Sequence, residues 1–267
     1  MMKDITLGQY YPVESPIHSL DPRTKLMGTM VYIISLFIAD NLACYLLGIV
    51  FLAVVIRLSR VPLSYITRGL KPIAALLLIS VLFNLFLTNG EPLYWQWKFL
   101  KITGTGLRQA FYMGLRLVLL IMGSSLMTFT TTPTSLTDGL EKGLRFLNTF
   151  HVPVHEVAMM MSIALRFIPI LTEETDKIQK AQMARGADFE NGNIIARAKA
   201  MIPLLVPLFI SAWRRATDLA MAMEARCYHG GSGRTKMFPL EYKQADRIGY
   251  GILAGYLIAL CLLRFLL

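Results

Sequence analysis

Charged residues are scarce in this sequence of 267 residues. Asp, Glu, Lys and Arg together make up 16% of the chain, whereas hydrophobic residues make up 55% and the mean hydropathy is +0.51. About one-quarter of an ordinary soluble domain is charged, so this chain has too few charges to cover a water-facing surface of its size. The composition excludes an ordinary soluble protein and predicts an integral membrane protein.

Cysteine is also rare, and the motifs of common catalytic and metal sites are missing. The three cysteines, Cys44, Cys227 and Cys261, are scattered and odd in number, which favours neither a disulfide framework nor a thiolate metal site. A proline separates His151 from His155 and no third ligand is near them, so we predict no metal site. The phosphate-binding pattern G-x-x-x-x-G-K-[ST] is absent, and no Ser, Cys or Thr has a recognisable nucleophile setting. We therefore expect no catalysis and no bound cofactor in this chain.

The charges that are present are mainly basic. Lys and Arg number 27 against 17 Asp and Glu, which gives a net charge of +10. In a membrane protein this excess indicates cytoplasmic loops and anionic partners rather than nucleic acid. Basic residues are concentrated before residue 26 and in the loop 57–71, and are sparse in 89–107. The positive-inside rule then predicts a multi-pass protein with a cytoplasmic N-terminus and an outside C-terminus.

Five apolar stretches predict the membrane spans. Residues 26–56 would form a helix about 46 Å long with Asp40 near its centre, which suits neither the length nor the polarity of a hydrocarbon layer of about 30 Å. A hairpin that turns at Asp40-Asn41 divides this stretch into two spans. The other three spans are predicted at 72–88, about 109–131 and about 248–267.

Two smaller features belong to this membrane part. The alternating aromatic residues 94–99 predict a short strand or interfacial element. Arg116 lies two turns into the fourth span, where we expect it to snorkel outward; the alternative is a buried polar contact.

The segment 132–247 differs in composition from the rest. It holds 15 of the basic and 12 of the acidic residues, and its apolar stretches at 157–171 and 202–212 are short and contain prolines. We therefore predict a cytoplasmic domain of amphipathic helices at the membrane face. The predicted organisation is spans 1–4 in residues 1–131, this domain in 132–245 and the last span in 246–267.

One motif in this domain occurs twice. Ala184-Arg185-Gly186 and Ala225-Arg226-Cys227 each end a helical stretch. Taken singly, each is a helix stop, because Arg suits the last turn and Gly suits the position after it. The duplication favours a second interpretation, in which small neighbours leave each guanidinium free to pair bidentately with carboxylates in a groove. Two such arginines predict two similar acceptor sites.

Methionine is frequent in the same domain. Met159, Met160 and Met161 are consecutive. Such residues either pack softly in a core or form an adaptable surface for exchangeable partners. Both alternatives stay open here, and under the second these three methionines form part of a partner interface.

The sequence resembles a known family at several of these places. Residues 15–26, with Asp21, Pro22 and Arg23 at their centre, look like the opening signature of the transmembrane T component of energy-coupling factor (ECF) transporters, the EcfT/CbiQ-type family. By itself, Asp21-Pro22 predicts an N-cap and a first-turn proline. The paired Ala-Arg-small motifs and residues 165–169 are also similar to the family, with Cys227 as a departure from Ala-Arg-Gly.

This resemblance implies an all-α integral membrane protein of about five transmembrane helices with a cytoplasmic domain of coupling helices. Such a protein lies in a prokaryotic plasma membrane. It joins two ABC-type ATPases, which bind ATP and Mg²⁺, to a membrane-embedded substrate-binding S component. The complex imports vitamins or other micronutrients, and the S component selects the substrate. The Ala-Arg-small motifs would contact the ATPases, and Met159 to Met161 would contact the S component.

Two other classes of protein remain open at this point. A conventional six-span permease would need residues 157–171 to cross the membrane. A membrane-embedded enzyme would use Asp, His or Thr at the cytoplasmic face, such as the threonines at 130–132, and would need a convergent His/Asp/Glu cluster, which the sequence does not show.

Overall fold

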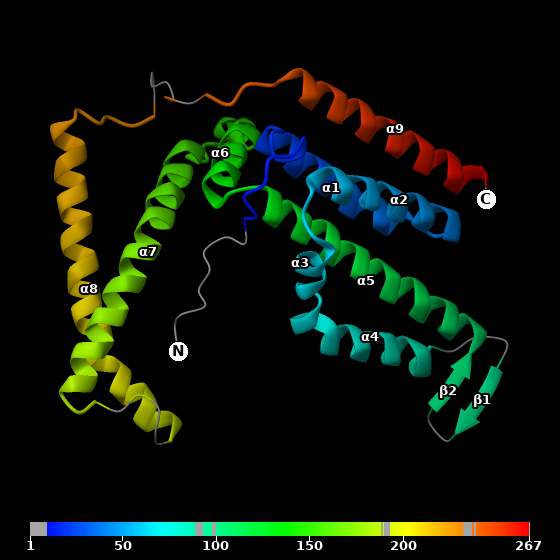
Figure 1. Ribbon diagram of the computed structural model, residues 1–267, viewed down its shortest axis with the longest axis horizontal. Helices are drawn as coiled ribbons and strands as arrows, with labels where there is room; N and C mark the ends of the chain where they lie inside the picture. The colour runs from blue at the N-terminus through cyan, green and yellow to red at the C-terminus, as the bar shows by residue number, and fades with distance from the viewer. Residues whose placement is uncertain are drawn as a thin grey trace. The chain divides into compact units, whose positions relative to one another are not determined.

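A computed structural model describes residues 10–88, 93–97, 100–187, 189, 193–231, 237 and 239–266 of the chain. These residues form nine α-helices, two short 3-10 helices and one two-stranded antiparallel hairpin (Figure 1). The helices are α1 Pro22–Ile38, α2 Leu42–Ser59, α3 Leu63–Arg68, α4 Ala74–Leu87, α5 Gly104–Thr130, α6 Pro133–Gly143, α7 Val154–Ala184, α8 Ile194–Ala225 and α9 Gln244–Leu266. The hairpin pairs β1 Leu93–Trp97 with β2 Leu100–Thr103, and the 3-10 helices are η1 Lys71–Ile73 and η2 Arg145–Phe150.

The chain divides into two compact units. One comprises residues 8–139 and 240–267 and is called the bundle unit below. The other contains residues 140–239 and is called the two-helix unit because α7 packs on α8 within it. The predominantly helical fold agrees with the sequence-based prediction. The short strand predicted at 94–99 is found as β1 as far as Trp97, and residues 98–99 lie outside the described residues.

The first two helices of the bundle unit confirm the predicted hairpin. α1 ends at Ile38 and α2 begins at Leu42, so the turn contains Asp40. The Asp40 carboxylate is exposed and lies 3.3 Å from the guanidinium of Arg264, near the end of α9. This contact places the end of α9 at the same end of the bundle as the α1–α2 turn.

The core of the bundle unit lies among α1, α2, α5 and α9, which run side by side in Figure 1. Tyr32 and Tyr256 are buried from α1 and α9, and the Tyr256 hydroxyl lies 2.7 Å from that of Ser35. A Cβ atom at Gly123 would lie 2.6 Å from the Tyr32 ring, so only glycine lets α5 approach α1 this closely. Small and aromatic residues together allow these short helices to pack tightly.

Within the described residues, five helical stretches are long and apolar enough to cross a membrane. They are Leu42–Ser59, Leu63–Phe86, Gly104–Thr130, Val154–Ala184 and Gln244–Leu266. The number agrees with the prediction, but the set differs, because α7 is included and the 17-residue α1 is not. α1 is about 26 Å long and falls slightly short of a hydrocarbon layer of about 30 Å.

The prolines in 140–239 do not interrupt the helices that contain them. Pro169 lies inside the continuous 31-residue α7, and Pro203 and Pro207 lie inside the 32-residue α8. A proline removes one backbone hydrogen bond but does not end a helix that tertiary contacts support. Between these helices, the Glu174 carboxylate of α7 accepts hydrogen bonds from Ser211 and Arg215 of α8.

Candidate functional site

The first Ala-Arg-small motif forms the end of α7. Ala184 is the last helical residue, Arg185 is the C-cap and Gly186 has φ +86°, in the left-handed region. The Gly186 amide donates to the Met183 carbonyl at 2.9 Å, and the Ala187 amide donates to the Gln182 carbonyl at 3.0 Å. This pair of bonds is a Schellman motif, which satisfies carbonyls that a helix end otherwise leaves unpaired.

The second motif ends α8 with the same backbone geometry. Arg226 is the C-cap and Cys227 has φ +56°. The Cys227 amide donates to the Glu224 carbonyl at 2.8 Å, and the Tyr228 amide donates to the Met223 carbonyl at 3.1 Å. The sequence-based prediction that both motifs stop helices is therefore confirmed, and the two helix ends match bond for bond.

The two arginine side chains are not needed for these caps. Backbone amides make the capping hydrogen bonds, and both Arg185 and Arg226 are exposed. Within the described part of the chain, neither guanidinium takes part in an ion pair or a side-chain hydrogen bond. Ala184 and Ala225 are exposed beside them. Each helix end therefore presents an uncommitted planar cation with a small neighbour, which suits a carboxylate-lined groove.

The consecutive methionines lie on the first half of α7. Met160 and Met161 are exposed and Met159 is half-buried. Exposed methionine is compatible with an adaptable contact surface. Its assignment to a partner stays a prediction.

The motif Asp21-Pro22-Arg23 forms the start of α1, as predicted. Asp21 is the N-cap, its carboxylate accepts from the Arg23 amide at 2.9 Å, and Pro22 occupies the first turn. The Arg23 guanidinium pairs with the same carboxylate through two nitrogens, at 3.0 and 2.9 Å. It also lies 3.9 Å above the Tyr242 ring and donates to the Leu240 carbonyl at 3.5 Å. Arg23 thus connects the start of α1 to the segment before α9.

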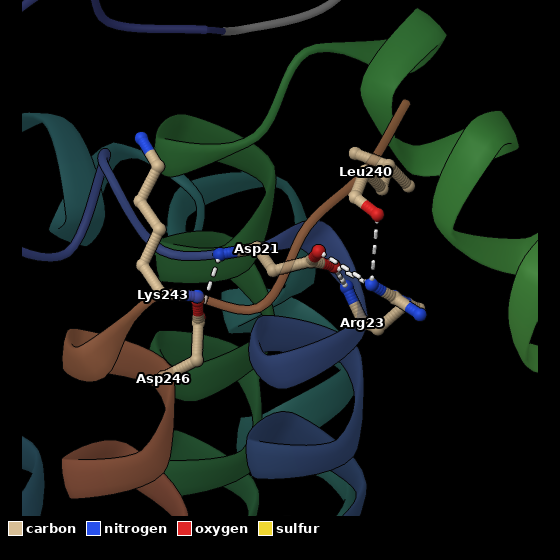
Figure 2. A network of polar contacts seen from close by, with 5 residues as sticks. All are labelled: Asp21, Arg23, Leu240, Lys243 and Asp246. Carbon is tan, nitrogen blue, oxygen red and sulfur yellow. Dashed lines mark hydrogen bonds and ion pairs between the residues drawn. The ribbon is translucent and has the colours of Figure 1, made fainter. Parts of the chain in front are cut away.

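Asp246 was not identified from the sequence, although it completes this network (Figure 2). It is 1% exposed, and its two carboxylate oxygens each accept from a backbone amide at 2.8 Å, from Asp21 and from Lys243. The bond to Lys243 is half of a capping box, because Lys243 directly precedes α9 and Asp246 is its third residue. The bond to Lys243 could be predicted from the sequence because the two residues are close along the chain. The bond to Asp21 could not, because that residue is 225 positions away.

Both connections to residues 140–239 contact this motif inside the bundle unit. Gly139, the last bundle residue before that segment, would place a Cβ 2.9 Å from the Cβ of Pro22. Leu240, the first bundle residue after it, accepts the hydrogen bond from Arg23. The motif therefore fixes the two positions at which the chain leaves and re-enters the bundle.

Arg116 makes polar contacts inside the bundle unit. It donates to the Tyr45 hydroxyl at 3.0 Å and to the Ala39 carbonyl, at the α1–α2 turn, at 3.3 Å. The alternative, a polar contact within the bundle, is the one found. Ala39 follows the last residue of α1, so its carbonyl accepts no hydrogen bond within a helix. It lies beside α5 and accepts from Arg116 instead.

Comparison with known proteins agrees with these features. Residues 13–237 match the CbiQ family, described as cobalt transport protein, and the chain belongs to this family. It is 55% identical over 249 residues to a protein of Clostridium kluyveri, with 93% of this chain and 92% of that protein covered. Its identity is 50% over 265 residues to an Acidaminococcus fermentans protein (99% and 98% covered) and 46% over 266 residues to one of Bacillus subtilis (100% and 99%).

All three relatives carry the name energy-coupling factor transporter transmembrane protein EcfT. The family and the apolar helices together make this chain a transmembrane transport component of the EcfT type.

Proposed function

We propose that the chain is the coupling subunit of an ECF-type importer. In this proposal it holds two ABC-type ATPases and one membrane-embedded S component, and it passes ATP-driven motion from the former to the latter. The imported substrates are vitamins or other micronutrients, and the S component selects among them. The names of the relatives and the coverage of nearly the whole chain support this assignment.

The observation that carries the proposal is the pair of matched helix ends. α7 and α8 end in the same hydrogen-bond pattern, and each presents an exposed arginine that makes no capping bond. A single such end is an ordinary helix stop. Two equivalent ends in one compact unit suit a symmetric or pseudosymmetric pair of partners, as two ATPases are. Helices of 31 and 32 residues can act as levers between those ends and a distant partner.

In this proposal the chemistry belongs to the partners. The ATPases bind ATP and Mg²⁺ and hydrolyse the nucleotide, while this chain acts without a cofactor or catalytic residue of its own. The coupling helices lie on the cytoplasmic side of a prokaryotic plasma membrane, where ATP is available. Met159, Met160 and Met161 form part of the surface that meets the S component.

The test replaces the paired arginines. Arg185→Ala and Arg226→Ala each leave partner carboxylates unpaired, a loss of about 2–5 kcal/mol for a desolvated charge pair. Each single variant should retain ATPases weakly, because the remaining contact holds them at high effective concentration. The double variant should lose the ATPases in co-purification and lose ATP-driven uptake, while the S component stays bound. Lysine at either position should rescue only in part, since it keeps the charge without the planar fork.

Arg214→Ala provides the matched control. Arg214 is also an exposed arginine of α8, but it lies three turns before the helix end. Its removal should leave assembly and uptake unchanged. If the double variant kept both ATPases and normal uptake, the coupling assignment would be wrong. Each arginine would then only stabilise its own helix, by about 0.3–1 kcal/mol, through its charge near the negative end of the helix dipole.

A further inference from the structure

α7 and α8 run antiparallel within the two-helix unit. The Gln182 side chain of α7 donates to the Pro203 carbonyl of α8 at 3.5 Å. Glu174, eight positions earlier on α7, accepts from Arg215, twelve positions later on α8. Contacts that move backward along α7 thus move forward along α8, and Figure 1 shows the two helices running in opposite directions. The C-terminal ends of α7 and α8 therefore lie at opposite ends of the helix pair.

The two Ala-Arg-small motifs align the helices position by position. When Arg185 is aligned with Arg226, Glu174 aligns with Arg215, because each lies eleven positions before its motif arginine. These two aligned residues also contact each other across the helices. In an antiparallel pair, aligned residues meet only at the centre, where a two-fold axis would relate one helix to the other. The contact of Glu174 with Arg215 therefore lies at the centre of the helix pair.

The two arms that extend from this contact to the motif arginines are equal in length. Eleven helical positions rise about 17 Å, and no proline lies in either arm. A second pair of positions agrees with the axis. Met223, which aligns with Gln182, shares a groove with Ile163, one position from the residue that aligns with Pro203. The arms are thus arranged almost symmetrically about one polar contact.

Glu174 joins α7 to two side chains of α8. One of its carboxylate oxygens accepts from the Ser211 hydroxyl at 2.8 Å, and the other accepts from the Arg215 guanidinium. A fully exposed ion pair contributes little to stability. This one is partly covered, since 25% of the Glu174 side chain and 40% of the Arg215 side chain are exposed, and a hydroxyl shares the carboxylate.

Apolar packing is incomplete beside this contact. A groove of about 260 Å³ lies between the helices, and its lining includes Phe167, Leu171 and Leu219 together with Arg215. Interlocking side chains normally fix the angle at which two helices cross. Here a groove interrupts that packing, so we assign much of the control over the crossing to the polar contact.

We propose that Glu174 and Arg215 are positioning residues that fix the crossing of α7 and α8, and thereby the separation of Arg185 and Arg226. The inference rests on the proposed function, in which both arginines dock into equivalent ATPase grooves at once. A rotation of about 10° at the contact moves the end of each 17 Å arm by about 3 Å. Such a displacement is enough to break a bidentate hydrogen bond.

The first experiment exchanges the two charges in the purified full-length protein. In a cysteine-free background, spin labels at Ala181 and Ala222, which are exposed and aligned with each other, report the separation of the arms. Wild type should give one narrow distance distribution. Glu174→Arg and Arg215→Glu each place like charges at the contact, so each should shift and broaden the distribution. The double exchange should restore it.

ATP-driven uptake by the assembled complex is the second measurement. Each single reversal should lower uptake by about tenfold, the factor expected for one lost charge-assisted contact, and the double exchange should recover most of it. Glu174→Gln keeps the shape of the side chain and should cause a smaller loss in the same direction. Circular dichroism confirms that each variant keeps its helices.

Glu173 and Arg214 provide the matched control. They carry the same charges one position earlier on each helix, and both are exposed. Glu173→Arg, Arg214→Glu and their combination should change neither the distance distribution nor uptake.

Three results would overturn the proposal. Unchanged distances in both single reversals would mean that apolar packing alone fixes the crossing. A double exchange that restored nothing would mean that the two side chains do not act as a pair. Restored distances without restored uptake would mean that the arm separation is not what the ATPases require. Failure of the proposed function itself is seen separately, as ATPases retained when Arg185 and Arg226 are both replaced by alanine, and the distance measurement does not depend on it.

Discussion

Cys227 occupies, at the end of α8, the backbone position that Gly186 occupies at the end of α7. Both residues have positive φ, +56° and +86°. A residue with a side chain is disfavoured in this region by about 1–2 kcal/mol, and glycine is not. The second helix end therefore carries a conformational cost that the first one lacks, although their hydrogen bonds are the same.

A pair of substitutions tests this difference. Cys227→Gly should stabilise the end of α8 by about 1 kcal/mol, and Gly186→Ala should destabilise the end of α7 by a similar amount. No atom lies within 4 Å of a Cβ placed at Gly186, so the second change measures conformation without a clash. Hydrogen exchange at the Tyr228 and Ala187 amides, which close the two caps, is the measurement. Exchange at Tyr228 that is not slowed by Cys227→Gly would contradict the argument.

At the scale of elements, Asp246 joins the start of α9 to the start of α1. Its two oxygens accept from the Asp21 and Lys243 amides, at 2.8 Å each. Since the carboxylate is buried, its removal leaves two amides without partners rather than exposing them to water.

Asp246→Ala should therefore destabilise this junction by about 2–6 kcal/mol, at about 1–3 kcal/mol for each unpaired buried amide. Asp246→Asn should have a smaller effect, because only its single amide oxygen can accept. The measurements are the thermal transition of the purified protein and hydrogen exchange at 243–247. The control is Asp40→Ala, which removes an exposed carboxylate from a pair with Arg264 and should change little. Equal effects of the two alanine variants would be inconsistent with a buried junction.

The helix ends could be predicted from the sequence because their signals are local. Asp21-Pro22 begins α1, the arginines with their small neighbours end α7 and α8, and Asp40 marks a turn. The partner of Arg116 could not be named from the sequence because Tyr45 lies 71 positions away. The full lengths of α7 and α8 could not be predicted from their short apolar stretches, since interhelical contacts such as Glu174 with Arg215 support helices that contain prolines.

At the scale of the whole molecule, the bundle contacts bear on the number of membrane crossings. Gly139 contacts Pro22, and Leu240 accepts from Arg23, so both lie at the end of the bundle where α1 begins. The α1–α2 turn and the end of α9 lie at the other end, where Asp40 meets Arg264. A segment whose two ends are on the same side of a membrane must cross it an even number of times. α7 meets the length and polarity for a span, so a crossing by α7 would require a second crossing within the same segment.

An even number of crossings is inconsistent with a six-span permease, in which α7 alone would cross, and labelling can test whether α7 crosses at all. The three native cysteines are first replaced, and single cysteines are introduced at Val152 and Ala181, two exposed positions on either side of most of α7. Ser64 and Thr105, exposed residues that precede α4 and begin α5, give the inside and outside references. If α7 stays on one side, Val152 and Ala181 label together with Ser64, from inside only. If α7 spans, Ala181 labels with Thr105 and the cytoplasmic domain is excluded. The two positions are about 29 residues apart, or about 43 Å of helix, so a spanning α7 could not leave both on the same side.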